Sequence, residues 1–146
     1  MARNKSINFP NTQAELSSLF DKLQRSTTSE LLKAGGLVIH GSASLLAKTA
    51  NTIYFMIDGQ VYSKAASDMA ALSGTVANAT FNVFVFSVNA TGTLATQMGT
   101  AATTLGGVVF PAVPDQSVSI GFVIINPTGT GPFVGGTTAL DDGTVV

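Results

Sequence analysis

Hydrophobic positions change their spacing near residue 36, from a helical pattern to a strand pattern. Upstream, large apolar side chains recur at intervals of three and four residues, which places Leu16, Leu19, Phe20 and Leu23 along one side of a helix. Thr12 precedes this stripe in Thr-Gln-Ala-Glu, a capping-box pattern that satisfies the first free N–H groups of a helix. The sequence therefore predicts an amphipathic helix within residues 11–33.

A polar run over residues 26–29 interrupts the apolar stripe. Ser29 is a good N-cap residue, so we expect a second short helix that begins there and extends to Leu32 or Lys33. Gly35 and Gly36 follow, and glycine readily adopts the left-handed conformation that ends helices. The helical part of the chain is expected to stop at this pair.

After Gly36, short apolar runs alternate with turn residues, as is typical of antiparallel β-structure. The expected strands cover residues 37–40, 45–49, 53–57, 60–63, 81–88, 93–98, 104–110 and 118–126, with weaker candidates at 133–134 and 144–146. Residues 65–72 are expected to form a helical turn or a loop across a sheet edge. Residues 127–132 are rich in Gly and Pro and predict a loop.

Two of these predictions rest on especially clear local signals. Asp58 and Gly59 separate two β-rich runs, and an Asp-Gly pair supplies the positive φ angles of a type I′ hairpin turn. The run from Phe81 to Val88 is almost continuously apolar, which indicates a strand that is buried on both faces or lies at an interface. Residues 89–92 are expected to turn the chain into the next strand.

Together these elements predict a mainly β fold: an antiparallel β-sandwich or barrel with an N-terminal α-helical arm. We divide the chain into an arm with the amphipathic helix, residues 1–35, and an antiparallel β domain, residues 36–146. The last expected strand, 144–146, is of a kind that often pairs with another strand, and a neighbouring subunit is one candidate.

Charge is scarce and unevenly distributed along the 146 residues, of which 10% are charged. All seven basic residues lie at or before Lys64, whereas residues 69–146 contain only Asp115, Asp141 and Asp142. By surface scaling, each charge in that half serves about 1,200 Å², more than the roughly 800 Å² that one partner contributes to a standard interface. This favours self-association or docking, although the many Ser and Thr residues also hydrate a surface without charge.

Patterns for catalysis and cofactor binding are missing from the sequence. His40 is the only histidine, there is no cysteine, and Asp141 and Asp142 fit a turn better than a calcium loop. No nucleophile elbow or phosphate-binding glycine pattern occurs. We therefore expect no enzyme activity, no metal and no cofactor.

The net charge of −1 and the short apolar runs likewise predict no nucleic-acid partner, no secretory signal and no membrane span.

Aromatic side chains in the charge-poor half are the best candidates for an interface, because interface cores are rich in aromatics and poor in charge. The candidates are Phe81, Phe84, Phe86, Phe110, Phe122 and Phe133. For any one of them, a place in the core of a sandwich is the simpler interpretation. As a set they favour an interface more strongly, because Phe84 and Phe86 share one strand face and the opposite face is apolar too.

The order of several segments resembles small structural proteins of tailed-phage virions, of the capsid decoration or cement type. The segments are residues 53–66 (IYFMIDGQVYSKAA), 81–88 (FNVFVFSV), 111–115 (PAVPD), 120–125 (IGFVII) and 133–141 (FVGGTTALD). The likeness spans residues 37–146. It implies a homo-oligomer, commonly a trimer, on the outer surface of the capsid, where it clamps neighbouring copies of the major capsid protein without catalysis.

On this hypothesis, residues 37–146 form the oligomeric body, and residues 1–33 form an arm that contacts the capsid or a neighbouring protomer. The alternative is a head-fibre or adhesin-like module that binds a host-surface glycan. Such a site needs aromatic rings, and the chain offers Tyr54 and Tyr62 but no tryptophan.

Overall fold

The computed structural model describes residues 17–20 and 29–142. Residues 17–20 are helical. The rest forms ten strands and one short 3-10 helix: β1 (Glu30–Lys33), β2 (Leu37–Ile39), β3 (Ala47–Thr49), β4 (Ile53–Ile57), β5 (Gln60–Lys64), β6 (Thr75–Val76), β7 (Asn82–Asn89), β8 (Leu94–Met98), η1 (Leu105–Gly107), β9 (Ser117–Ile125) and β10 (Phe133–Val134).

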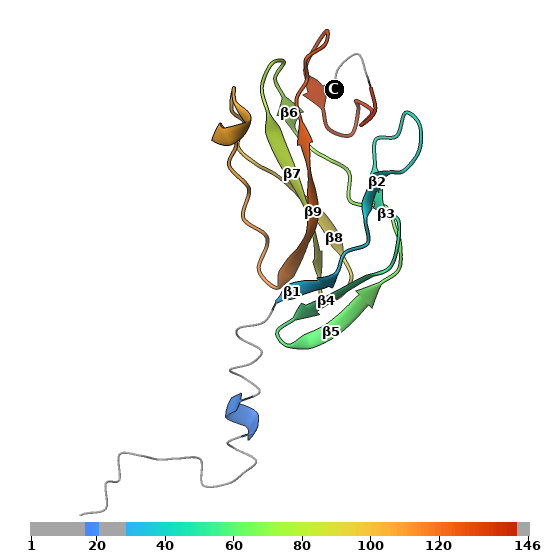
Figure 1. Cartoon of the computed structure of the whole chain (residues 1–146), viewed down its shortest axis with the longest axis vertical. Coiled ribbons are helices and arrows are strands. Elements are labelled where there is room, and N and C mark those ends of the chain that lie inside the picture. Colours follow the sequence, from blue (N-terminus) through green and yellow to red (C-terminus); the bar gives the residue numbers. More distant parts are fainter. Residues whose placement is uncertain (1–16, 21–28, 143–146) are drawn as a thin grey trace, which may run out of the picture.

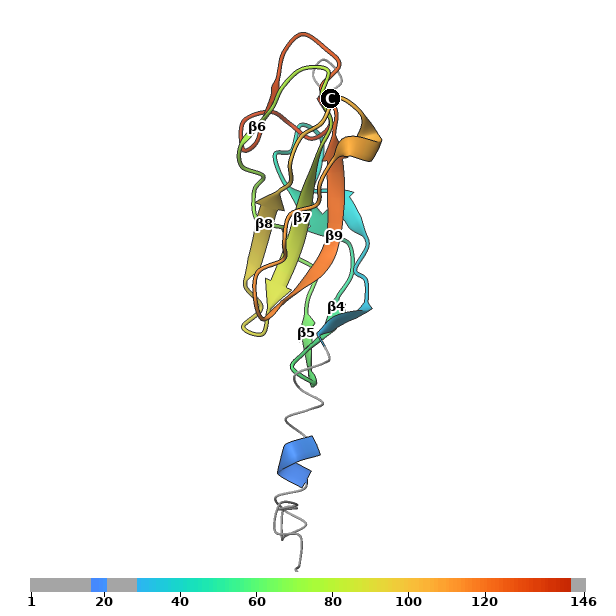
Figure 2. The same ribbon diagram turned by 90° about the vertical axis from the view of Figure 1, so that its left-hand side faces the viewer.

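The strands pair only in antiparallel fashion and make four small sheets, β1-β4-β5, β2-β3, β8-β7-β9 and β10-β6. The sheet β8-β7-β9 runs along the body, and β2 to β5 lie on one side of it (Figure 1). The segment between β8 and β9 lies on the other side (Figures 1 and 2). The predicted mainly β, antiparallel fold is confirmed, and its arrangement is sandwich-like.

One hydrophobic core lies between these sheets. It combines Phe55 of β4, Phe84 and Phe86 of β7, Ile120 of β9 and Phe133 of β10, all of them buried. The rings of Phe84 and Phe133 meet edge to face, with centroids 6.2 Å apart. These residues come from strands far apart in the sequence, so the core joins the sheets into one folded body.

The predicted hairpin at Asp58 and Gly59 is confirmed. Both residues have positive φ, 50° and 74°, as a type I′ turn requires, and β4 and β5 pair on either side of them. The turn after β7 is also confirmed. There the side-chain oxygen of Asn89 accepts hydrogen bonds from the backbone N–H groups of Thr91 and Thr93, at 3.0 and 2.9 Å.

The predicted second helix at residues 29–33 is wrong, because this segment contains β1. Leu31 pairs with Phe55 of β4, and the hydroxyl of Ser29 accepts a hydrogen bond from Asp58 N at 3.2 Å instead of capping a helix. Pairing with a distant strand overrides the local helix preference. Residues 30–33 therefore belong to the β body, and Gly36, with φ of 68°, turns the chain between two strands.

The predicted strand at residues 104–110 is wrong as well. The chain forms η1 there, and Thr100 and Val109 close the loop around it by two backbone hydrogen bonds of 2.9 and 3.2 Å. Gly106 and Gly107 fall inside this segment, and paired glycines disfavour a continuous strand. Residues 65–72 form a loop, in which Asp68 makes an isolated bridge to Lys48 of β3. The short strand β6, which pairs with β10, was not predicted.

Candidate interaction surface

The sheet β8-β7-β9 has an inner face toward the core and an outer face away from it. Phe84 and Phe86 point inward, so the alternation of side chains places Val83 and Val85 on the outer face. Val85 pairs with Phe122 of β9, and Val83 pairs with Ile124. Directly opposite residues share a face, so Phe122 and Ile124 also lie outward.

The segment between β8 and β9 covers part of this outer face. Gly99 N donates a hydrogen bond to Val83 O at 2.8 Å, and a Cβ atom on Gly99 would lie only 2.4 Å from Val109 O. The backbone of this segment therefore runs close above β7 and buries Val83 and Val85. This explains why β7 is apolar on both faces within a single chain.

Phe110, which lies in this segment, and Phe122 of β9 remain exposed. Their rings meet edge to face with centroids 5.2 Å apart, and 53% of Phe110 and 52% of Phe122 remain accessible to solvent. Together with the exposed Ile124 we call them the aromatic patch. The charged residues described after position 68 are Asp115, Asp141 and Asp142, so the patch lies in a part of the chain with very few charges.

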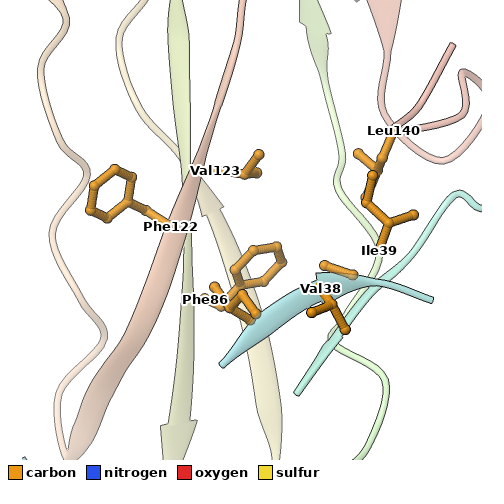
Figure 3. Close-up of a pocket in the computed structure, with 8 residues that line it drawn as sticks. Val38, Ile39, Phe86, Phe122, Val123 and Leu140 are labelled. Carbon is orange, nitrogen blue, oxygen red and sulfur yellow. The ribbon is translucent and has the colours of Figure 1, made fainter. Parts of the chain in front are cut away.

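An apolar pocket of about 270 Å³ lies between β2 and β9 (Figure 3). It is lined by Leu37, Val38, Ile39, Ala47, Phe86, Phe122, Val123 and Leu140. Leu37 packs against Gly121, where a Cβ atom would lie 2.6 Å from Leu37 Cδ1. Val38 and Ile39 are exposed, so apolar surface continues outside the pocket.

The candidate interface residues fall into distinct groups. Phe84, Phe86 and Phe133 are fully buried in the chain's own core, so the core interpretation applies to them and they offer no surface to a partner. Phe81 is half-buried and bridges to Ala102. Phe110 and Phe122 form the aromatic patch.

In the arm, Leu19 and Phe20 lie in the helical residues 17–20 and are exposed. Leu16, Leu23 and the capping box lie outside the described residues, as does the expected strand 144–146. The stripe along the arm helix therefore stays a prediction.

Sequence reasoning missed the pocket and its rim on β2. The run Leu37 to Ile39 does carry a signal, because three consecutive apolar residues place apolar side chains on both faces of a strand. Leu37 packs on Gly121 of β9, and Val38 and Ile39 are exposed. The distant residues that complete the pocket, such as Leu140, have no local sequence signal.

His40 lies on the surface and contacts Asp68, with Nδ1 against a carboxylate oxygen. Both side chains are substantially exposed, and an exposed pair of this kind contributes little to stability. A shallow pocket of about 390 Å³ next to them is lined also by Lys48 and Ser67. Within the described part of the chain, no group of three or more His, Cys, Asp or Glu side chains is placed to hold a metal ion.

The predicted turn around Asp141 is confirmed, and it is tied to the loop after β2. The carboxylate of Asp141 accepts a hydrogen bond from Ala43 N at 3.0 Å, and Leu140 N donates to Ser44 O at 2.9 Å. These two bonds hold Leu140 against the apolar pocket. Asp141 thus has a structural role in the wall of that pocket.

The two tyrosines lie on opposite faces of the β4-β5 hairpin. Tyr62 pairs with Phe55 and stacks on its ring at 5.7 Å, whereas Tyr54 pairs with Ser63 and is exposed beneath the amine of Lys33. They therefore do not form one aromatic platform of the kind that a sugar ring needs.

Comparisons with known proteins find no relative of this chain. No family model matches the chain, and neither curated proteins nor solved structures show a significant match to it. Among residues 17–20 and 29–142, no helix has the length and apolar character needed to cross a bilayer.

Proposed function

We propose that this protein is a non-enzymatic structural component of a phage capsid, of the decoration or cement type. In this role it self-associates, most simply as a trimer, and binds the major capsid protein on the outer surface of the head. Its contribution is mechanical: it joins neighbouring capsid subunits by adding contact area. The proposal combines the resemblance in the order of sequence segments with the surface of the β body.

The observation that carries the proposal is the aromatic patch. Phe122 of β9 and Phe110 of the segment before β9 are half exposed, in a part of the chain with very few charges. Large aromatic side chains, together with depletion of charge, characterise the centres of protein interfaces. A protein that acts by contact needs such a surface and no reactive group.

The arm supplies the second surface of the proposal. Leu19 and Phe20 are exposed in the helical residues 17–20, and the seven basic residues all lie in the first 64 positions. A short helix is marginal on its own in water and gains stability when its apolar side packs on something. We assign the capsid contact to this arm and self-association to the β body.

Replacing both Phe110 and Phe122 with serine is expected to convert the wild-type oligomer to a single chain and to lower the capsid-bound fraction about tenfold or more. The reason is that exposed aromatic anchors dominate interface energies, and a monomer also loses the gain from multivalent attachment. Light scattering after size exclusion measures the mass, and co-sedimentation with capsids of the same virus measures binding.

The matched control for this double variant is Val61→Ser, which removes an equally exposed apolar side chain from β5, 64% accessible, far from the patch in sequence. It should keep the wild-type mass and binding. A wild-type protein that is a stable monomer at micromolar concentration and stays in the supernatant would contradict the proposal.

Deleting residues 1–28 is expected to abolish capsid co-sedimentation while leaving the oligomeric mass per chain unchanged. The deletion stops before Ser29 because the Ser29 hydroxyl and β1 belong to the β body. Unchanged capsid occupancy by the shortened chain would show that the arm is not the capsid-binding surface. Circular dichroism of the shortened chain checks that the β body remains folded.

A further inference from the structure

We propose that copies of this chain associate head to tail, with the Phe110 and Phe122 rings of one copy seated in the apolar pocket between β2 and β9 of the next. This inference rests on the self-association in the proposed function and deepens it. It names both sides of the contact and makes the occupant of the pocket a second copy of the chain.

The pocket fits an aromatic side chain in size and chemistry. Its volume is about 270 Å³, and a protein cavity of about 150 Å³ already accommodates benzene. All eight lining residues are apolar. A polar or charged occupant would lose its hydrogen bonds to water without replacement, so the pocket favours an apolar one.

The aromatic patch fits the role of that occupant. The rings of Phe110 and Phe122 hold each other edge to face at 5.2 Å, and both are half exposed. Two rings that already pack against each other lose less conformational freedom on entering a pocket than two free side chains do, so more of the burial energy remains for binding. Neither surface includes a charged residue, so no ion has to be desolvated on contact.

The patch and the pocket lie on opposite sides of β9. In Figure 3, the Phe122 ring points away from the side chains of Phe86 and Val123, which face the pocket. Phe122 is one of the residues that line the pocket, although its ring points away from Phe86 and Val123. Because the strand separates the two surfaces, the Phe122 ring cannot fill the pocket of its own chain, and a second copy can.

The backbone around the pocket also favours a partner. β9 is an outer strand of β8-β7-β9, and β2 pairs only with β3, so two strand edges border the pocket. Strand edges carry backbone groups without a ladder partner and are commonly covered in stable proteins. A neighbouring copy seated here would shield these edges together with the exposed Val38 and Ile39.

Two different surfaces in contact make a heterologous interface, which closes into a ring or extends as a filament. A closed ring of three is the trimer that the sequence resemblance implies. A twofold dimer formed through the patch alone would bury the patch of each copy and leave the pockets of both copies open. When the patch of one copy contacts the pocket of the next in a closed ring, both apolar surfaces of every copy are buried.

The test uses one variant for each side of the contact, with masses measured by light scattering at tens of micromolar. Phe110→Ser removes one inserted ring and leaves every residue that lines the pocket, whereas Ile39→Glu places a charge in the pocket wall and leaves the patch. Each variant alone is expected to fall to the mass of one chain. An equimolar mixture is expected to give a two-chain species, because one intact patch then meets one intact pocket.

Phe122→Ser, which also removes a pocket-lining side chain, serves as a second patch variant, and Val61→Glu on β5 is the control that should retain the wild-type mass. Thermal unfolding within a few degrees of the Val61→Glu control verifies that each variant is folded. Variants that keep the wild-type mass would overturn the head-to-tail contact while self-association itself stands. Two monomeric variants whose mixture stays monomeric would also overturn it. A monomeric wild type would instead refute the self-association in the proposed function.

Discussion

Replacing Phe84 with alanine is expected to lower the free energy of unfolding by about 3–5 kcal/mol. Phe84 is fully buried at the middle of β7, opposite Met98 of β8 and Val123 of β9, and its ring packs against Phe133. The substitution loses the transfer energy of the ring and leaves a cavity that the sheets on either side cannot close. Because natural domains are stable by about 5–15 kcal/mol, this one change removes a large part of the total.

Urea unfolding followed by circular dichroism measures this effect, and Phe122→Ala on the neighbouring strand is the matched control. Phe122 is half exposed, so its truncation in a dissociated chain should cost less than about 1.5 kcal/mol. The stability lost in Phe84→Ala should not depend on protein concentration. The stability lost in Phe122→Ala should grow with protein concentration, because only this substitution weakens the oligomer. Equal and concentration-independent losses would contradict the division of these residues into core and surface.

Replacing Gly35 with alanine is expected to destabilise the fold by about 1–3 kcal/mol. The added Cβ would lie 2.6 Å from Asn51 O, 2.7 Å from Ile53 Cγ2 and 2.9 Å from Thr49 Cβ. Thr49 and Ile53 are buried, and Asn51 N donates to Gly35 O at 2.9 Å, so none of these neighbours can move aside cheaply. The clash falls where the chain passes from β1 to β2.

Gly41→Ala is the matched control for this change. No atom lies within 4 Å of a Cβ at Gly41, and its φ is not positive, so the effect should stay within about 0.5 kcal/mol of zero. Thermal and urea unfolding of the two variants side by side give the comparison. Equal stability of Gly35→Ala and Gly41→Ala would show that the close packing at Gly35 is not a feature of the folded protein.

Elements with a strong local signal were predictable from the sequence. The hairpin at Asp58 and Gly59 depends on two adjacent positive φ angles, and β7 depends on one long apolar run. The strand β1 was not predictable, because Glu-Leu-Leu-Lys is a good helical sequence that becomes a strand only through pairing with β4. Its conformation is set by residues more than 20 positions away.

The candidate interaction surface was predictable only in part, because exposure depends on contacts between distant segments. Composition drew attention to the phenylalanines of the charge-poor half, but it could not separate buried Phe84 from exposed Phe122. Phe84 faces the core between the sheets, whereas Phe122 lies on the outer face, where the segment around Gly99 and Val109 folds over β7 and leaves the adjacent part of β9 open. The pocket brings together Ile39, Ala47 and Leu140, and no local pattern indicates that they meet.

Electron cryomicroscopy of capsids incubated with the purified protein tests the proposed function most directly. The proposal predicts additional density on the outer surface of the head, repeated at symmetry-related positions, into which the β body fits as a ring of copies with the patch of one against the pocket of the next. Capsids that carry no additional density under saturating protein, compared with capsids alone, would contradict the proposal.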